Sequence, residues 1–172
     1  MLEAPRRAAI GRVDRGQVGR IMDVKFPYNL PIWRRSHQAE SPNKKYMAEI
    51  NPATEISMGN PTYGTLNLSN GLSLAKCNPS FIWSDDSRFL AVPQYTSNWF
   101  RSFGKQRLLI IDIGENLGWQ ISPKIAYYIQ PETFISGELT VTLNPARKSR
   151  EIVTYSIPKD LGIFTTMALP PL

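Results

Sequence analysis

The side chains that could do chemistry are few and scattered along the sequence. The chain holds one histidine, His37, and one cysteine, Cys77, whereas a zinc site needs several ligands of these types. The carboxylates of Asp85 and Asp86 could in principle work as an acid–base pair. They stand in a Ser/Asp-rich stretch, however, and such side chains usually accept hydrogen bonds from turn backbone N–H groups. The sequence contains neither a G-x-S-x-G elbow nor a G-x-x-x-x-G-K phosphate loop. We therefore assign no catalytic residue, no metal and no cofactor, and lean against an enzyme.

A segment rich in aromatic and basic residues is the first candidate contact surface. Residues 94–107 lie between two apolar segments and predict a long hairpin loop at the surface. Aromatic residues and arginine are enriched at the centres of protein interfaces. We expect six side chains of this loop to contact a partner: Tyr95, Trp99, Phe100, Arg101, Phe103 and Lys105. Two alternatives remain, a loop that stacks single-stranded bases and a lid folded over the end of a sheet.

A basic turn is the second candidate contact surface. Residues 144–150 contain three cations, Arg147, Lys148 and Arg150, between two segments with strand patterns. These cations could bind an anionic partner, in which case the affinity would fall steeply with salt. The alternative is that they are simply solvated at a hairpin tip.

Charge and composition limit the class of protein. The net charge of +6 is concentrated in residues 1–50, and a basic excess attracts anionic partners without saying anything about the fold. Residues 1–20 are rich in Arg and Gly and predict a flexible basic tail. We expect one domain over residues 21–163 and an extended tail over residues 164–172. No stretch reaches the ~18 apolar residues of a membrane span. A single cysteine excludes an internal disulfide and fits a reducing compartment, so we expect the cytoplasm.

The remaining patterns predict strands and tight turns. Residues 65–68 and 72–75 flank Asn70-Gly71, which supplies the positive φ angles of a hairpin turn. Residues 107–113 are almost continuously apolar, which indicates burial on both faces of a sheet. Residues 137–143 and 151–157 alternate apolar and polar residues. Since no stretch has a sustained helical period, we predict an all-β domain of about ten strands in antiparallel meander sheets.

Two segments of the chain resemble each other. Ser41–Ile50 and Ser84–Val92 both contain a turn, a basic residue, an aromatic residue and aliphatic residues, and Ser84 lies 43 positions after Ser41. A period of ~40–45 residues is typical of four-stranded propeller blades. These segments resemble the turn of TolB-like and WD-type propeller repeats, although Asn43 replaces an expected Asp-Gly and Ile111-Asp112-Ile113 replaces the Trp-Asp pair.

The resemblance implies blade-like sheets, but the chain supplies only two or two and a half blades, where a propeller needs about four. We prefer two sheets packed on each other over the alternatives, which are part of an oligomeric propeller and a barrel. The function we expect is that of a non-catalytic β-rich protein-binding module, such as an inhibitor, an immunity-type protein or an assembly partner. A hydrolase or carbohydrate-acting enzyme with carboxylates in a sheet-end cleft is the alternative. We expect the partner to be another protein or a second copy, rather than a nucleic acid.

Overall fold

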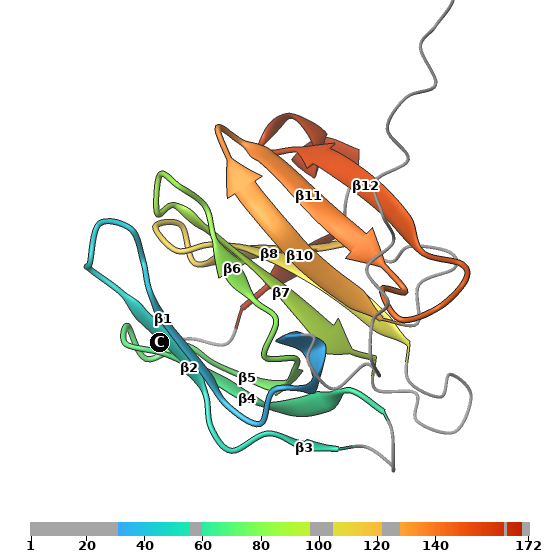
Figure 1. Cartoon of the computed structure of the whole chain (residues 1–172). Coiled ribbons are helices and arrows are strands. Elements are labelled where there is room, and N and C mark those ends of the chain that lie inside the picture. Colours follow the sequence, from blue (N-terminus) through green and yellow to red (C-terminus); the bar gives the residue numbers. More distant parts are fainter. Residues whose placement is uncertain (1–30, 56–59, 97–104, 122–127, 164, 170–172) are drawn as a thin grey trace, which may run out of the picture.

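The fold consists of strands in two antiparallel sheets. The computed structural model describes residues 31–55, 60–96, 105–121, 128–163 and 165–169, and this part of the chain forms thirteen strands (Figure 1). Its helical turns are of the 3-10 type, η2 (Pro31–Trp33) and η3 (Lys159–Ile163). The predicted all-β fold is confirmed, and within the described ranges no helix has the length and apolarity to cross a membrane.

The larger sheet contains two consecutive meanders. The strands of the first meander are β1 (His37–Glu40), β2 (Met47–Ile50), β4 (Thr62–Leu68) and β5 (Ser73–Cys77), with β3 (Thr54–Glu55) paired to β4. The strands of the second meander are β6 (Ile82–Trp83), β7 (Phe89–Tyr95), β8 (Gln106–Asp112) and β9 (Leu117–Ile121). The strand pairing between the two meanders, β5 with β7, consists of one residue pair, Cys77 with Gln94. The large sheet is therefore nearly divided at this point.

The smaller sheet packs against the second meander. Its strands are β10 (Ile129–Ile135), β11 (Glu138–Leu143) and β12 (Glu151–Ser156), in that order. Figure 1 shows this sheet stacked over β7 and β8, with β12 at its outer side. The described strands form no closed barrel, and the expected arrangement of two packed sheets agrees with the structure.

The hairpin of β7 and β8 is the centre of the core, because both of its faces are buried. Alternate residues such as Leu90 and Leu109 pack against the first meander. The residues between them, such as Ala91 and Ile110, pack against the smaller sheet. This arrangement confirms the burial on both faces that the apolar run of residues 107–113 predicted. It also makes β7–β8 the layer between the other two parts of the molecule.

Two strand boundaries differ from the prediction. We expected a loop over residues 94–107, but β7 continues through Pro93 to Tyr95 and pairs with β8 throughout. The carbonyl of Pro93 accepts a hydrogen bond from the N–H of Asn78, so its nitrogen also faces away from β8. Because N–H and C=O of one strand residue point to the same side, the missing donor costs no bond to β8.

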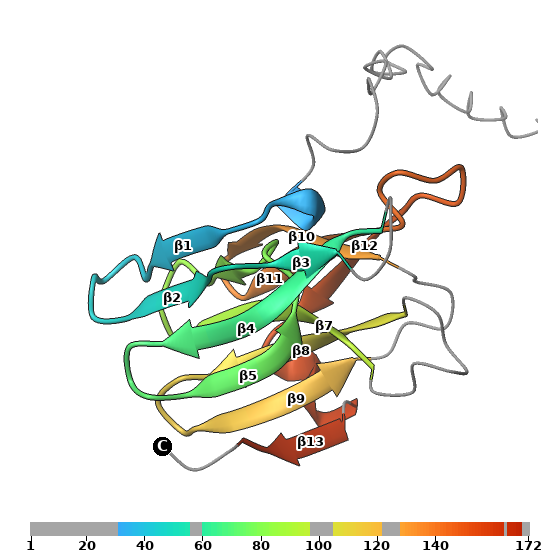
Figure 2. The ribbon, with the colours of Figure 1, turned by 90° about the horizontal axis from the view of Figure 1, so that it is seen from below.

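The expected C-terminal tail also contains a strand. β13 (Thr165–Ala168) pairs antiparallel with β9 and forms the edge of the large sheet (Figure 2). Its four residues satisfy main-chain groups of β9 that would otherwise form an open edge. The predicted tail at residues 1–20 lies outside the described residues.

Candidate functional site

The turn before β2 is held by three short-range hydrogen bonds. Ser41 Oγ accepts the N–H of Tyr46 at 3.0 Å and donates to Asn43 Oδ1 at 2.8 Å. Asn43 Oδ1 also accepts the N–H of Lys45 at 3.0 Å. Lys44 has a φ of 60°, the left-handed conformation that such a turn requires. The turn chemistry predicted from Ser and Asn is therefore present here.

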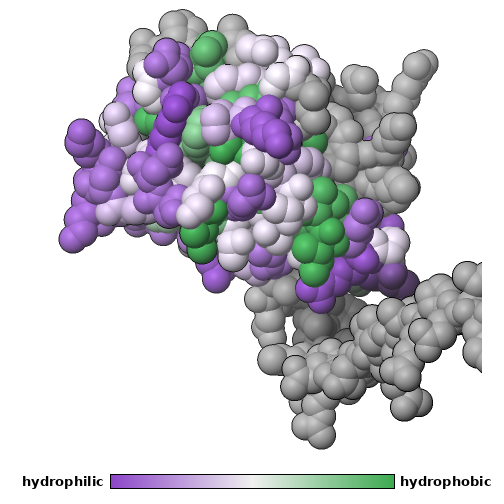
Figure 3. All heavy atoms as spheres, turned by 90° about the horizontal axis from the view of Figure 1, so that it is seen from above, coloured by the Kyte–Doolittle hydropathy of each residue, from purple (hydrophilic) through white to green (hydrophobic). Residues whose placement is uncertain are grey.

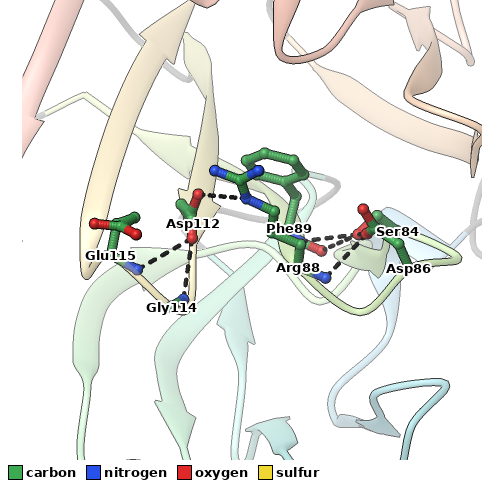
Figure 4. A network of polar contacts seen from close by, with 7 residues as sticks. All are labelled: Ser84, Asp86, Arg88, Phe89, Asp112, Gly114 and Glu115. Atoms are coloured by element: carbon green, nitrogen blue, oxygen red, sulfur yellow. Dashed lines mark hydrogen bonds and ion pairs between the residues drawn. The ribbon is translucent and has the colours of Figure 1, made fainter.

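The turn before β7 repeats this geometry. Ser84 Oγ accepts the N–H of Phe89 at 2.8 Å and donates to Asp86 Oδ1 at 2.5 Å. Asp86 Oδ1 accepts the N–H of Arg88 at 3.0 Å, and Ser87 has a φ of 66°. Figure 4 shows the bonds of this second turn. The two turns thus form the same bonds 43 positions apart. They also touch, because Asn43 donates its N–H to Ser87 Oγ at 2.9 Å.

The carboxylate of Asp112 holds a turn. Asp112 is 1% exposed and forms an ion pair with Arg88 at 2.8 Å. Its other oxygen accepts the N–H groups of Gly114 and Glu115 at 3.0 and 3.1 Å, as Figure 4 shows. Asp112 therefore fixes the turn after β8 and links it to the turn before β7.

The Asp85 side chain holds the neighbouring hairpin of the smaller sheet. One of its oxygens accepts the N–H of Asp86 at 3.0 Å, and the other accepts the N–H of Ser136 at 2.9 Å. The N–H of Asp85 in turn donates to the carbonyl of Phe134 at 3.0 Å. The turn-forming interpretation of the Asp85–Asp86 pair is therefore the one that the geometry supports.

Neither the cysteine nor the histidine is placed for catalysis. Cys77 is fully buried, and burial raises the pKa of its thiol to about 12, so the thiol is protonated at neutral pH and a poor nucleophile. His37 packs against Phe81 with 4.6 Å between ring centroids. Partial burial, and then the charge of Arg34, lower the pKa of His37. In the described ranges, no three His, Cys, Asp or Glu side chains gather as metal ligands.

The structure describes the two ends of the predicted aromatic loop. Trp99, Phe100, Arg101 and Phe103 lie outside the described residues. Lys105 is exposed, and its carbonyl accepts the N–H of Thr96 at 3.2 Å, which closes the hairpin.

Tyr95 is a correction to the predicted contact set. It is 5% exposed, and its hydroxyl donates to the carbonyl of Pro61 at 3.2 Å. Because β7 extends to this residue, its side chain packs in the interior and cannot contact a partner.

Arg107 links neighbouring strands at the base of the β7–β8 hairpin, a role that the sequence analysis missed. Its Nε and Nη2 donate to Gln94 Oε1 at 2.9 and 2.7 Å, and its Nη1 donates to Gln120 Oε1. One guanidinium thus links β7, β8 and β9, and desolvation lowers the pKa of Arg107. The sequence pattern indicates this role of Arg107 only weakly, because Gln94 and Gln120 are distant in the sequence and become its partners only when the strands pair.

The three cations of the predicted basic turn lie together in the connection from β11 to β12. Arg147, Lys148 and Arg150 are all exposed, and the guanidinium of Arg147 lies over the ring of Tyr128 at 5.2 Å. The connection is anchored by Asn144, whose N–H donates to the carbonyl of Tyr128 at 2.8 Å. The structure therefore places a positive surface directly before β12.

The outer edge of β12 is a further candidate that the sequence did not reveal. Ile157 donates its N–H to Gly137, so bonds to β11 involve the odd-numbered residues of β12. The N–H and C=O groups of Ile152 and Thr154 therefore point away from β11. The N–H of Ser156 points the same way and donates to Asp160 Oδ2 at 2.8 Å. Among the described strands, none pairs with this edge.

The surface near this sheet is mainly polar. Seen from above, the described surface is largely hydrophilic and carries separate hydrophobic patches (Figure 3). Two of the large exposed apolar side chains belong to the smaller sheet, Ile135 at 58% and Ile152 at 61% exposure. Since Val153 and Tyr155 pack toward the second meander, Ile152 and Thr154 point outward.

A separate hollow of about 510 Å³ lies beside β3. It is lined by residues that include Arg35, Asn51 and Glu55. Among the described residues that line it, Glu55 is the only carboxylate, so these residues supply no carboxylate pair of the kind that hydrolysis of a sugar would use.

No family model, no curated protein and no solved structure matches the chain. The resemblance to propeller repeats stays a prediction, while the repeated turn geometry is a property of this chain.

Proposed function

We propose that the protein is a protein-binding module that accepts an extended segment of its partner along the edge of β12. The observation that carries this proposal is the set of outward N–H and C=O groups at Ile152 and Thr154, which have no partner among the described residues. In strand addition, main-chain hydrogen bonds supply affinity, and the alternating side chains supply specificity.

The composition of β12 supports this role. Sheet edges are normally protected by lysine, proline, bulges or very short strands. β12 has six residues, Glu151–Ser156, with neither lysine nor proline among them and no bulge in its pairing with β11. By contrast, β1 has only four residues. The edge of β12 is thus the less protected of the two.

The basic turn adds a preference for acidic partners. Arg147, Lys148 and Arg150 precede the open edge and are exposed. Charges at the rim of an interface mainly increase the association rate and the salt dependence of binding. We therefore expect the bound segment to carry an acidic residue near this end of β12.

The alternative, a hydrolase that uses carboxylates, has less support. The oxygens of Asp85, Asp86 and Asp112 accept hydrogen bonds that shape turns. A general acid or base needs a carboxyl group within reach of a substrate proton. Replacing these residues would therefore change folding stability before it changed any turnover.

A proline substitution at Thr154 tests the proposal. Thr154→Pro removes one outward N–H and leaves the bonds to β11 intact, since proline is tolerated on an edge strand when its nitrogen faces solvent. Heptapeptides selected from a random display library on the unmodified protein should bind Thr154→Pro about tenfold more weakly, which corresponds to the loss of roughly one main-chain hydrogen bond.

The matched control is Thr154→Val, which changes the side chain and keeps the N–H. It should bind the selected peptides nearly as well as the unmodified protein. Selected peptides that bind Thr154→Pro without loss would show that the contact surface lies elsewhere, and the loop predicted over residues 94–107 would be tested next.

A further inference from the structure

We infer that the segment paired with β12 is β12 of a second copy, arranged antiparallel about a two-fold axis. This inference rests on the proposed function and names the partner of the same edge. Three features of the edge support the inference. The open part of the edge is symmetric about one residue, and an antiparallel pair of edges brings basic groups of one copy to acidic groups of the other. The edge also leaves a large apolar side chain exposed.

Both ends of the open edge are closed by the chain itself. At one end the N–H of Arg150 donates to the carbonyl of Arg147 at 3.1 Å. At the other end Asp160 accepts the N–H of Ser156 at 2.8 Å. The N–H donors left for a partner are those of Ile152 and Thr154, which lie on either side of Val153. An edge that is open symmetrically about Val153 has the pattern that an isologous antiparallel pair requires.

The two-fold axis through Val153 fixes the register. It sets Ile152 of one copy opposite Thr154 of the second copy, and the same pairing recurs on the other side of the axis. Such residues exchange both N–H···O=C bonds as a hydrogen-bonded pair. The two smaller sheets would then continue into each other across the interface.

This register also covers the exposed apolar side chains. Ile152 is 61% exposed and points to the outer face of its sheet. In the paired arrangement, Ile152 of one copy and Ile152 of the second copy are diagonal neighbours, which lie roughly 7–8 Å apart and can touch when the side chains are long. Ile152 also packs against the β-branched Thr154 directly opposite.

The charges agree with the same register. Arg150 comes opposite Ser156 of the second copy, and the carboxylate of Asp160 lies at the N–H of Ser156. The exposed basic turn of each copy therefore meets an acidic group of the other, once on each side of the axis. A parallel pairing would bring the basic turns together, and like charges opposite one another are destabilising.

The test is the solution mass of the full chain, measured by light scattering over a hundredfold range of concentration. We expect a monomer–dimer equilibrium that Thr154→Pro shifts to monomer and that Thr154→Val leaves unchanged. Arg150→Glu should weaken dimerisation about tenfold by facing Asp160 with a like charge. Lys45→Glu makes the same change of net charge at an exposed residue of a distant turn, and it should leave the mass unchanged.

Two results would overturn the inference. A monomer at every concentration would do so, and if library-selected peptides still bound at β12, the proposed function would stand with a different partner. A dimer that persists in Thr154→Pro would place the contact between copies on another surface. If neither peptides nor a second copy engaged the edge, the proposed function would fail as well.

Discussion

Asp112 illustrates how polar residues are used in this molecule. A buried carboxylate is costly unless it is paired and hydrogen-bonded. Asp112 meets both conditions, with Arg88 on one oxygen and two turn N–H groups on the other. Its role is to hold the end of β8 and the turn before β7 in fixed relation.

Replacement of Asp112 should therefore destabilise the fold. Asp112→Ala leaves two turn N–H groups without an acceptor, and we expect the free energy of unfolding to fall by about 2–4 kcal/mol. Arg88→Met is the comparison, because it removes the cation from the 1% exposed Asp112 carboxylate and keeps both turn N–H bonds. We expect it to lower the free energy of unfolding by more than the loss of a surface ion pair would, and by less than Asp112→Ala does. Urea denaturation measures both. Equal losses in the two variants would contradict the assignment of the main effect to the turn N–H groups.

His37 offers a test of the packing at β1. Its pKa is lowered below the unperturbed 6.5 by burial and by Arg34, so the unfolded chain binds the proton more tightly than the folded protein. The stability that depends on neutral His37 is complete above pH 6.5 and falls as the pH drops through the folded-state pKa.

An NMR titration of the His37 ring measures this pKa directly, since the chain contains one histidine. We expect a midpoint below 6.5, raised in Arg34→Met because one of the two causes is removed. A midpoint at or above 6.5 would contradict the packing of His37 against Phe81.

At the scale of elements, the repeated turn could be predicted from the sequence, and the end of β7 could not. Ser41 and Ser84 stand at equivalent positions of the two similar segments, and local side-chain chemistry decides how such turns form. The sequence therefore predicted both turns. The extension of β7 through Pro93 depends instead on the side of the strand to which the Pro93 nitrogen points, and local composition carries no information on this point.

The repeat leads to a prediction about the two serines. Ser41→Ala and Ser84→Ala each remove an acceptor for a strand N–H and a donor to the turn amide or carboxylate. Each should lower the free energy of unfolding by about 1–2 kcal/mol. Ser36→Ala is the control, since Ser36 is exposed. A loss at one serine alone, seen in thermal or urea unfolding, would show that the turns are not energetically equivalent.

The candidate site could be predicted only in part, because local composition carries no information on the tertiary arrangement of the strands. The cations at Arg147, Lys148 and Arg150 were visible as a cluster, and they lie together on the surface. That β12 ends its sheet is a property of the tertiary arrangement, because an alternating segment has the same pattern at an edge as in the middle of an antiparallel sheet. Tyr95 was misplaced because the boundary of β7 was predicted too early.

For the whole molecule, the β7–β8 hairpin is the layer between the first meander and the smaller sheet. The first meander covers one face of the hairpin and the smaller sheet covers the other. β13 pairs with the edge of β9, and the outer edges of β1, β13 and β12 have no partner strand in the part of the chain that the structure describes. Of these three strands β12 is the longest, with six residues against four in β1 and four in β13. The fold thus directs a new strand toward β12, next to the basic turn.

Amide hydrogen exchange at Ile152 and Thr154 is the most direct test of this account. We predict that both amides exchange fast in dilute protein and become protected as the concentration rises, while the Ser156 amide, bonded to Asp160, is protected throughout. Protection of Ile152 and Thr154 that is independent of concentration would show that the edge is already occupied within one chain. Fast exchange at every concentration would show that no second copy binds there, and either result would contradict the account.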